Sequence, residues 1–262
     1  MAKPRLIACD IDGTLLSAEQ VELPRELASL IDRIVDAGIV FAPASGRQYA
    51  GLRTLFSEFG NRLSYVAENG AIAYVGDELV HRAALDRSLG EEIARTMLAR
   101  PECELYVAGA ETCYVKPKRS AYVDHLKNYL RFDVTEIHDI DEIAEPFLKV
   151  SAYHVALNPD CEFWEQKFGG QCNVVRASAD WVDLTSPDAS KASGVKAVCD
   201  RLGIDPADCI AFGDADNDAA MLDLVGHPIA MSWGSEAVRA AAVETTSSVA
   251  EVLARILEEA GA

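Results

Sequence analysis

Residues 6–14 form the stretch Leu-Ile-Ala-Cys-Asp-Ile-Asp-Gly-Thr. Its first four residues form a short apolar run, which is typical of a strand buried inside a sheet. Two carboxylates and a glycine follow at once. Because ligands of parallel sheets bind beyond the carboxyl ends of the strands, the stretch predicts a strand that leads directly into a functional site.

Apolar strands and amphipathic helices alternate on both sides of this stretch. After it we expect a helix over 24–37, a strand over 39–42, a second helix around 52–59 and a strand over 64–67. Towards the C-terminus we expect a helix over 191–202, strands over 209–212 and 228–231, and helices over 235–242 and 248–260. This order is typical of an α/β domain in which helices cover a parallel sheet.

The rhythm changes between residues 82 and 187, where helices mix with hairpin-like strands. We interpret this stretch as an inserted α+β domain, with a hinge at Thr185-Ser186-Pro187-Asp188. The expected domains are therefore 1–81 and 188–262 for the two parts of the core, and 82–187 for the insertion.

Composition narrows the classes of function. The chain has 262 residues, with 42 acidic and 24 basic side chains and a formal net charge of −18. Such a surface repels nucleic acids and anionic membranes, so we expect neither as a partner. The seven cysteines form no CxxC pair, and no apolar run approaches the length of a membrane span or a signal peptide. These features predict a cytoplasmic protein with reduced thiols.

Asp10 and Asp12 carry the first chemical signal. A carboxylate that attacks a phosphate ester meets a dianion, which Mg²⁺ with oxygen ligands would neutralise. Attack forms an acyl phosphate and divides one difficult displacement into two easier ones. The second carboxylate could protonate the leaving oxygen and then deprotonate water. A plain Asx-rich turn is the alternative for the two aspartates alone.

Further polar clusters follow other expected strands. Asp214, Asp216 and Asp218 repel one another unless a cation or donors relieve them, so Asp214 is a candidate metal ligand and Asp218 a supporting one. Asp216 and Asn217 could also cap the next helix.

Ser45 and Gly46 could bind phosphate oxygens at a helix start, or simply cap that helix. Lys191 could supply a fixed positive charge for a transferring phosphoryl group.

The ordered set of motifs resembles the haloacid dehalogenase superfamily, in its Cof-type, sugar-phosphatase-like branch with a large α/β cap (class IIB). The motifs are residues 10–14, Ser45-Gly46-Arg47, Glu68-Asn69-Gly70-Ala71, Lys191 with Gly194, and residues 213–218. The resemblance covers nearly the whole chain. It implies a Rossmann-like core and a mobile cap that closes over a small phosphorylated substrate, first of all a sugar phosphate.

The resemblance also implies roles for the site residues. Asp10 would be the nucleophile and a ligand of Mg²⁺, and Asp12 the general acid and base that also ligates through its backbone carbonyl. Asp214 would be the third protein ligand, supported by Asp218. Ser45 and Lys191 would hold the phosphate, with help from Gly46 and Asn217.

Two segments depart from the family pattern. Ser232-Trp233-Gly234-Ser235 stands where an Asn-Ala pair is usual, and Thr246-Ser247-Ser248-Val249 replaces an acidic-Gly motif. We expect Trp233 simply to pack. Both segments lie outside the catalytic motifs, so they leave the expected chemistry intact.

Four functions other than a phosphatase could use a similar set of residues. A phosphomutase uses the same two aspartates, and free phosphate release distinguishes it. A phospho-sugar-binding protein without catalysis is disfavoured by the intact Asp10, Asp12, Lys191 and Asp214. The large insertion and Asp12 argue against a receiver-type signalling domain, and Asp12 would have no proton to handle in a dehalogenase.

Overall fold

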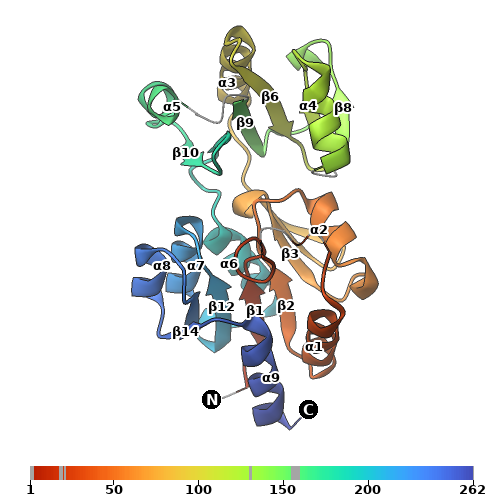
Figure 1. The fold of residues 1–262 in the computed structure, drawn as a ribbon, viewed down its shortest axis with the longest axis vertical. Coiled ribbons are helices and arrows are strands. Elements are labelled where there is room, and N and C mark those ends of the chain that lie inside the picture. The colour runs from red at the N-terminus through yellow and green to blue at the C-terminus, as the bar shows by residue number, and fades with distance from the viewer. Residues whose placement is uncertain (1–2, 18–19, 21, 130–131, 155–159, 262) are drawn as a thin grey trace. The chain divides into compact units, whose positions relative to one another are not determined.

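The computed structural model describes residues 3–17, 20, 22–129, 132–154 and 160–261 (Figure 1). The chain divides into two compact units. The core unit holds Met1–Arg47, Leu52–His81 and Ser190–Ala262, and the inserted unit holds Gln48–Gly51 and Arg82–Ala189. No helix among the described residues is both long enough and apolar enough to cross a bilayer.

A five-stranded parallel sheet forms the centre of the core unit, in the order β14-β13-β12-β1-β2. The central strand β1 pairs with β2 on one side and β12 on the other, and all four of its residues are buried. The strands are β1 (Leu6–Cys9), β2 (Val40–Pro43), β12 (Cys209–Gly213), β13 (His227–Met231) and β14 (Glu244–Thr246). The predicted α/β class with a parallel core sheet is therefore confirmed.

The strand expected over 64–67 forms, but it belongs to a second sheet. This β3 (Ser64–Ala67) pairs antiparallel with β4 (Ile72–Val75) in a three-stranded sheet completed by β5 (Glu78–Arg82). It meets the end of β2 through a parallel bridge between Ala44 and Val66, where the Ser45 N–H donates to the Val66 carbonyl at 2.9 Å. The hairpin partner β4 lies next in sequence, and local pairing of this kind gives β3 a different neighbour from the one that the strand–helix rhythm predicts.

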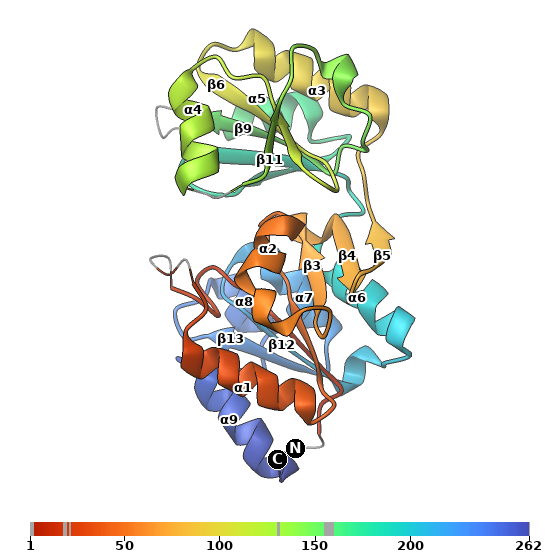
Figure 2. The ribbon, with the colours of Figure 1, turned by 90° about the vertical axis from the view of Figure 1, so that its right-hand side faces the viewer.

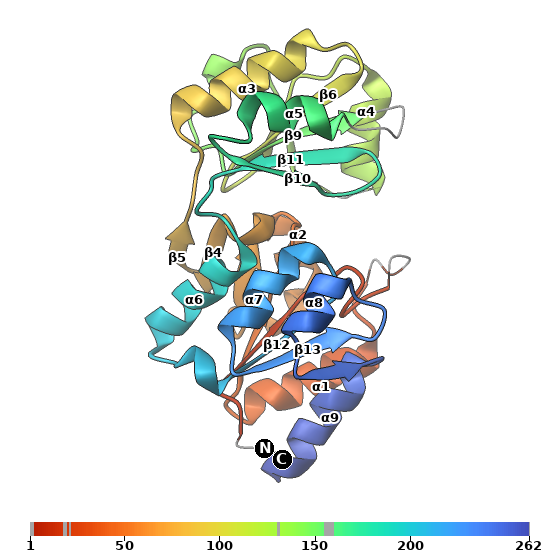
Figure 3. The same ribbon diagram turned by 90° about the vertical axis from the view of Figure 1, so that its left-hand side faces the viewer.

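Helices cover the two faces of the core sheet. One face carries α1 and α9, which contact each other, and the opposite face carries α6, α7 and α8 (Figures 2 and 3). The buried residues of α1 lie on one face of the helix, with Ile31 three or four residues from each of the others, as its amphipathic pattern predicts; they are Leu27, Ala28, Ile31 and Ile34. The helices are α1 (Arg25–Asp36), α2 (Tyr49–Leu55), α6 (Lys191–Leu202), α7 (Ala219–Leu224), α8 (Glu236–Ala241) and α9 (Val249–Ala260), with 3-10 turns η1 (Ser57–Phe59), η2 (Glu68–Gly70), η5 (Pro206–Asp208) and η6 (Asp216–Asp218).

The inserted unit contains a six-stranded sheet in the order β10-β11-β9-β6-β7-β8. Its pairs are antiparallel except β7 with β8. One face of the sheet packs against Ile93 and Met97 of α3 and against Trp164 and Phe168 of α5. The elements are α3 (Arg87–Ala99), β6 (Cys103–Ala108), β7 (Cys113–Val115), α4 (Ser120–Asp124), the π-helical η3 (His125–Tyr129), β8 (Val134–Glu136), η4 (Ile140–Glu142), β9 (Lys149–His154), α5 (Cys161–Phe168), β10 (Asn173–Arg176) and β11 (Trp181–Thr185).

Candidate active site

Three polar loops meet at the carboxyl edge of the core sheet, after β1, β2 and β12. Asp10 comes directly after β1, and its N–H continues the ladder by donating to the carbonyl of Phe212 at 3.0 Å. Asp214 comes directly after β12, so the two carboxylates leave neighbouring parallel strands at the same edge.

Lys191 joins the first and third of these loops. Its ammonium group donates to Asp10 Oδ1 at 2.5 Å and to Asp218 Oδ1 at 2.6 Å. Lys191 is only 2% exposed, and a lysine is almost never so buried unless its charge is paired. Its position is set by the start of α6, where the Ser190 side chain accepts from the Ser193 N–H in a capping box.

Burial and charge act in opposite directions on this pair. Burial raises the pKa of Asp10 to about 7, although the neighbouring Lys191 lowers it. Burial alone would lower the pKa of Lys191, but the carboxylates of Asp10 and Asp218 raise it above its ordinary value. Lys191 therefore keeps its positive charge at neutral pH.

Asp10, Asp214 and Asp218 form an acidic cluster that fits a divalent cation. One carboxylate oxygen from each lies within 4.8 Å of the others. Three carboxylates and the single Lys191 ammonium leave two negative charges, which a dication would cancel. Carboxylate oxygens are also the ligands that Mg²⁺ prefers. The donor set therefore suits the metal that the sequence predicts.

Hydrogen bonds hold the Asp214 loop in place around this cluster. Asp218 Oδ2 accepts from the N–H groups of Asp214 and Ala215, at 3.0 Å each. Thr14 Oγ1 donates to Asp214 Oδ1 at 2.7 Å and so connects this loop to the one after β1. Gly13 has a φ of +95°, and a Cβ there would lie 2.5 Å from Asp214 Oδ2, so only glycine permits this approach.

Asp12 faces a different partner. Arg47 Nε donates to Asp12 Oδ2 at 2.9 Å, and Arg47 Nη2 donates to Asp12 Oδ1 at 2.5 Å. The Asp12 side chain is 51% exposed, whereas Asp10 is buried. The two aspartates of the motif thus stand in different surroundings, one enclosed and one open to solvent.

The loop after β2 gathers the remaining predicted residues. Ser45 is buried, and its hydroxyl accepts from the Arg47 N–H at 3.2 Å. A Cβ on Gly46 would lie 3.0 Å from Asn69 Oδ1, and Asn217 Nδ2 donates to that same Asn69 oxygen at 3.1 Å. The Asn69 N–H also donates to the Ser45 carbonyl at 3.0 Å, so Ser45, Gly46 and Asn217 all lie next to Asn69.

The segment that carries Asn69 has an unusual backbone. Glu68 and Asn69 have φ angles of +50° and +56°, which side-chain-bearing residues seldom adopt. Gly70 follows with a φ of +88°, and a Cβ there would lie 1.8 Å from the carbonyl oxygen of Ser190. This close approach packs the turn onto the start of α6, beside Lys191. Non-glycine residues in this conformation cluster at functional sites.

Sequence reasoning gave no role to four residues that the structure places here. Arg47 and Asn69 stood in recognised motifs, but their side-chain partners lie at least 35 residues away in the chain. Thr14 was seen only as part of its motif. Trp233 was expected to pack, yet it is 57% exposed and its indole N–H donates to the carbonyl of Gly13 at 2.9 Å.

The sequence profile of the haloacid dehalogenase-like hydrolases matches residues 7–256. The chain belongs to this family. The chain is 28% identical over 240 residues to a 5-amino-6-(5-phospho-D-ribitylamino)uracil phosphatase of Escherichia coli. The aligned region covers 91% of this chain and 89% of the relative. The family predicted from the motifs is therefore confirmed, and with it the expected class of enzyme, a phosphatase of this family.

Solved structures agree with this haloacid dehalogenase-like fold. A crystal structure from Eubacterium rectale superposes with a TM-score of 0.86 at 26% identity, over 98% of this chain and all 100% of that one. A subclass IIB sugar phosphatase superposes with a TM-score of 0.76 at 20% identity, over 96% of this chain and 98% of that one. The second likeness concerns the fold alone.

Proposed function

We propose that the protein is a Mg²⁺-dependent phosphatase that releases phosphate from a small phosphorylated metabolite through an aspartyl-phosphate on Asp10. The observation that carries the proposal is the buried Asp10 carboxylate, held at 2.5 Å by the ammonium of Lys191 within a cluster of three aspartates. A nucleophile needs a fixed position and shielding from water, and this carboxylate has both.

In the first half-reaction an Asp10 oxygen attacks phosphorus, and the bond between phosphorus and the ester oxygen breaks. Protonated Asp12 gives its proton to the departing oxygen, so the alcohol leaves neutral. The products of this step are the alcohol, the aspartyl-phosphate and ionised Asp12.

In the second half-reaction water attacks the same phosphorus atom. Asp12 takes a proton from that water, the acyl–phosphate bond breaks, and the Asp10 carboxylate is regenerated with free phosphate. The exposed position of Asp12 suits this role, because it gives the side chain access to both leaving group and water. Arg47 donates to both oxygens of the ionised Asp12 carboxylate and orients it, and one of these hydrogen bonds must open when Asp12 carries the proton for the leaving group.

Mg²⁺ would be held by the carboxylates of Asp10 and Asp214 and by the backbone carbonyl of Asp12, with Asp218 in support. When bound, it would neutralise negative charge on the phosphate and on the cluster. Asp218 contributes through its two hydrogen bonds to the backbone of the Asp214 loop. It also shares Lys191 with Asp10, so the support reaches both metal loops.

The phosphate oxygens would be bound by the Ser45 hydroxyl, the Gly46 N–H, the Lys191 ammonium and the Asn217 amide. Ser45 and Asn217 are already positioned through Arg47 and Asn69. Because these donors are fixed before substrate arrives, they need no reorganisation as charge develops on the transferring phosphoryl group.

A sugar phosphate is the first substrate class to test. The relative from Escherichia coli acts on a phosphoribityl compound, and the subclass IIB structure is that of a sugar phosphatase. The seven cysteines are all free thiols in the structure, which supports our proposal of a cytoplasmic location.

Phosphate release from a panel of phosphorylated metabolites, in Mg²⁺ and in EDTA, tests this function. We expect release in Mg²⁺ only, and none from Asp10→Asn, which should fold normally. A folded protein that returns the phosphoryl group to its substrate would be a mutase, and one that binds but never cleaves would be a binding protein. Either result would refute the proposal.

A further inference from the structure

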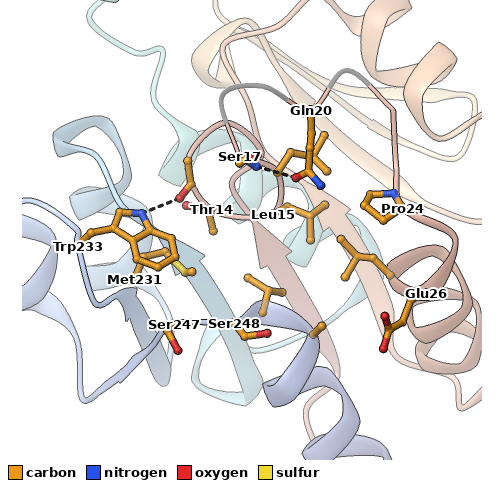
Figure 4. A pocket seen from close by; sticks show the side chains of 15 residues that line it. Thr14, Leu15, Ser17, Gln20, Pro24, Glu26, Met231, Trp233, Ser247 and Ser248 are labelled. Atoms are coloured by element: carbon orange, nitrogen blue, oxygen red, sulfur yellow. Dashed lines mark hydrogen bonds between the residues drawn. The ribbon is translucent and has the colours of Figure 1, made fainter.

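The turn between β13 and α8 is fastened to the loop that carries Asp10 and Asp12. Trp233 lies in this turn, is 57% exposed, and donates its indole N–H to the carbonyl of Gly13 (Figure 4). Because this large aromatic ring is exposed and is held by its N–H group, core packing does not explain its position.

The same turn is also fastened to the loop that carries Asp214. The Ser235 N–H donates to the Asp214 carbonyl at 2.8 Å, and the Gly234 N–H donates to the Met231 carbonyl at 2.8 Å. A Cβ on Gly234 would lie 3.3 Å from Asp214 Cα, so the turn presses closely on that backbone. Residues 233–235 thus bridge the two loops that supply the cluster of aspartates.

We infer that Trp233 is a positioning residue for the cation, and the inference rests on the proposed Mg²⁺ site. Its hydrogen bond fixes the peptide group of Gly13, which directly follows the Asp12 carbonyl assigned to the metal. Thr14 ties the two loops together through the Asp214 side chain, and Trp233 ties them through the backbone. Mg²⁺ demands near-ideal ligand geometry, so two ties between loops that share one ion strengthen its binding.

A different role for Trp233 would be purely structural. Its ring forms one wall of a cavity of about 280 Å³, together with Leu15, Met231 and Ser248 (Figure 4). Trp233→Phe separates the two roles, because phenylalanine keeps an aromatic wall and loses the N–H donor.

The test is the affinity for Mg²⁺ alone, measured by isothermal titration calorimetry on the full chain without substrate. We expect Trp233→Phe to bind Mg²⁺ about threefold to fivefold more weakly than the unchanged protein, the size of one net hydrogen bond at an exposed site. Turnover at saturating Mg²⁺ should recover, whereas turnover at low Mg²⁺ should not.

Trp164→Phe is the matched control. Trp164 lies in the inserted unit, and its indole nitrogen has no hydrogen-bond partner among the described residues. This variant should bind Mg²⁺ like the unchanged protein. Gly234→Ala is a second probe of the same turn, since its new Cβ would lie 2.9 Å from the Met231 carbonyl oxygen and 3.3 Å from Asp214 Cα, so the turn must shift and Mg²⁺ binding should weaken.

Equal Mg²⁺ affinity in Trp233→Phe and the unchanged protein would overturn the inference, even if the variant were less stable. The proposed function fails in a different way. If the unchanged protein binds Mg²⁺ but releases no phosphate, the phosphatase is refuted. If Trp233→Phe still weakens Mg²⁺ binding in that case, the positioning role stands.

Discussion

Lys191→Met removes the buried ammonium that pairs with Asp10 and Asp218 and leaves the two carboxylates without that partner. Methionine has nearly the volume of lysine, so the variant tests the charge and leaves packing almost intact. Breaking a buried ion pair by deleting one partner costs about 3–5 kcal/mol. Protonation of Asp10, whose pKa burial already raises to about 7, can relieve part of that cost. We therefore expect a loss near the lower figure, about 3 kcal/mol at pH 8.

Calorimetric unfolding in EDTA measures this loss. For a unit of this size, each kcal/mol corresponds to roughly 2–4 °C in unfolding temperature, so the core transition should fall by about 6–12 °C. Mg²⁺ should restore part of the difference, because it supplies positive charge to the same carboxylates.

A double-mutant cycle with Asp10→Asn isolates the contact. Once Asp10 is neutral, loss of Lys191 should cost about 2 kcal/mol less than it does in the unchanged protein. Lys149→Met is the control, because Lys149 is also buried and paired, with Asp183 in the inserted unit. Its effect should simply add to that of Asp10→Asn. Additivity within about 0.5 kcal/mol for Lys191 and Asp10 would refute the reasoning.

Further variants and conditions test the rest of the site. Asp12→Ala should slow phosphate release about 10²–10⁴-fold and leave Mg²⁺ affinity nearly unchanged by calorimetry, since its carboxylate handles protons; the reverse pattern would contradict an acid/base role. Gly70→Ala should destabilise the core unit by more than 1 kcal/mol in urea unfolding, because φ is +88° and the new Cβ would clash with the Ser190 carbonyl; unchanged stability would show that the turn can move. The raised pKa of Asp10 predicts that the metal-free core is most stable below the ordinary carboxyl pKa of 3.8 and loses that stability progressively as pH rises from there to about 7, where the buried carboxylate ionises. Scanning calorimetry in EDTA should show this fall, Mg²⁺ should reduce it, and Asp10→Asn should abolish it; an identical fall in that variant would assign it to other groups.

The sequence predicted those parts of the fold that depend on local pattern. The buried run before Asp10 and the amphipathic spacing of α1 and α6 come from neighbouring residues, and their elements formed within a residue or two of the expected bounds. The strand β3 was placed in the wrong sheet, because the choice between a parallel neighbour and a hairpin partner depends on competing long-range contacts.

Site contacts were less accessible from sequence. Parallel topology brings Asp10 and Asp214 to one edge of a sheet, which could be expected from their positions after strands. Two contacts depend on the directions of side chains that are far apart in the sequence. Arg47 and Asp12 are 35 residues apart, and Trp233 and Gly13 are 220 residues apart, so no local sequence pattern encodes either hydrogen bond. The catalytic roles assigned to the site residues stay predictions that the experiments above address.

Chemical trapping of the phosphorylated enzyme tests the central claim most directly. Asp12→Ala is mixed with p-nitrophenyl phosphate, whose leaving group needs no proton from Asp12, and is then quenched and reduced with borohydride, which converts an aspartyl-phosphate to homoserine. Peptide mass spectrometry should then find homoserine at position 10 and unchanged aspartate at position 214. Turnover by the unchanged protein with no homoserine at position 10 in the trapped variant would contradict the account.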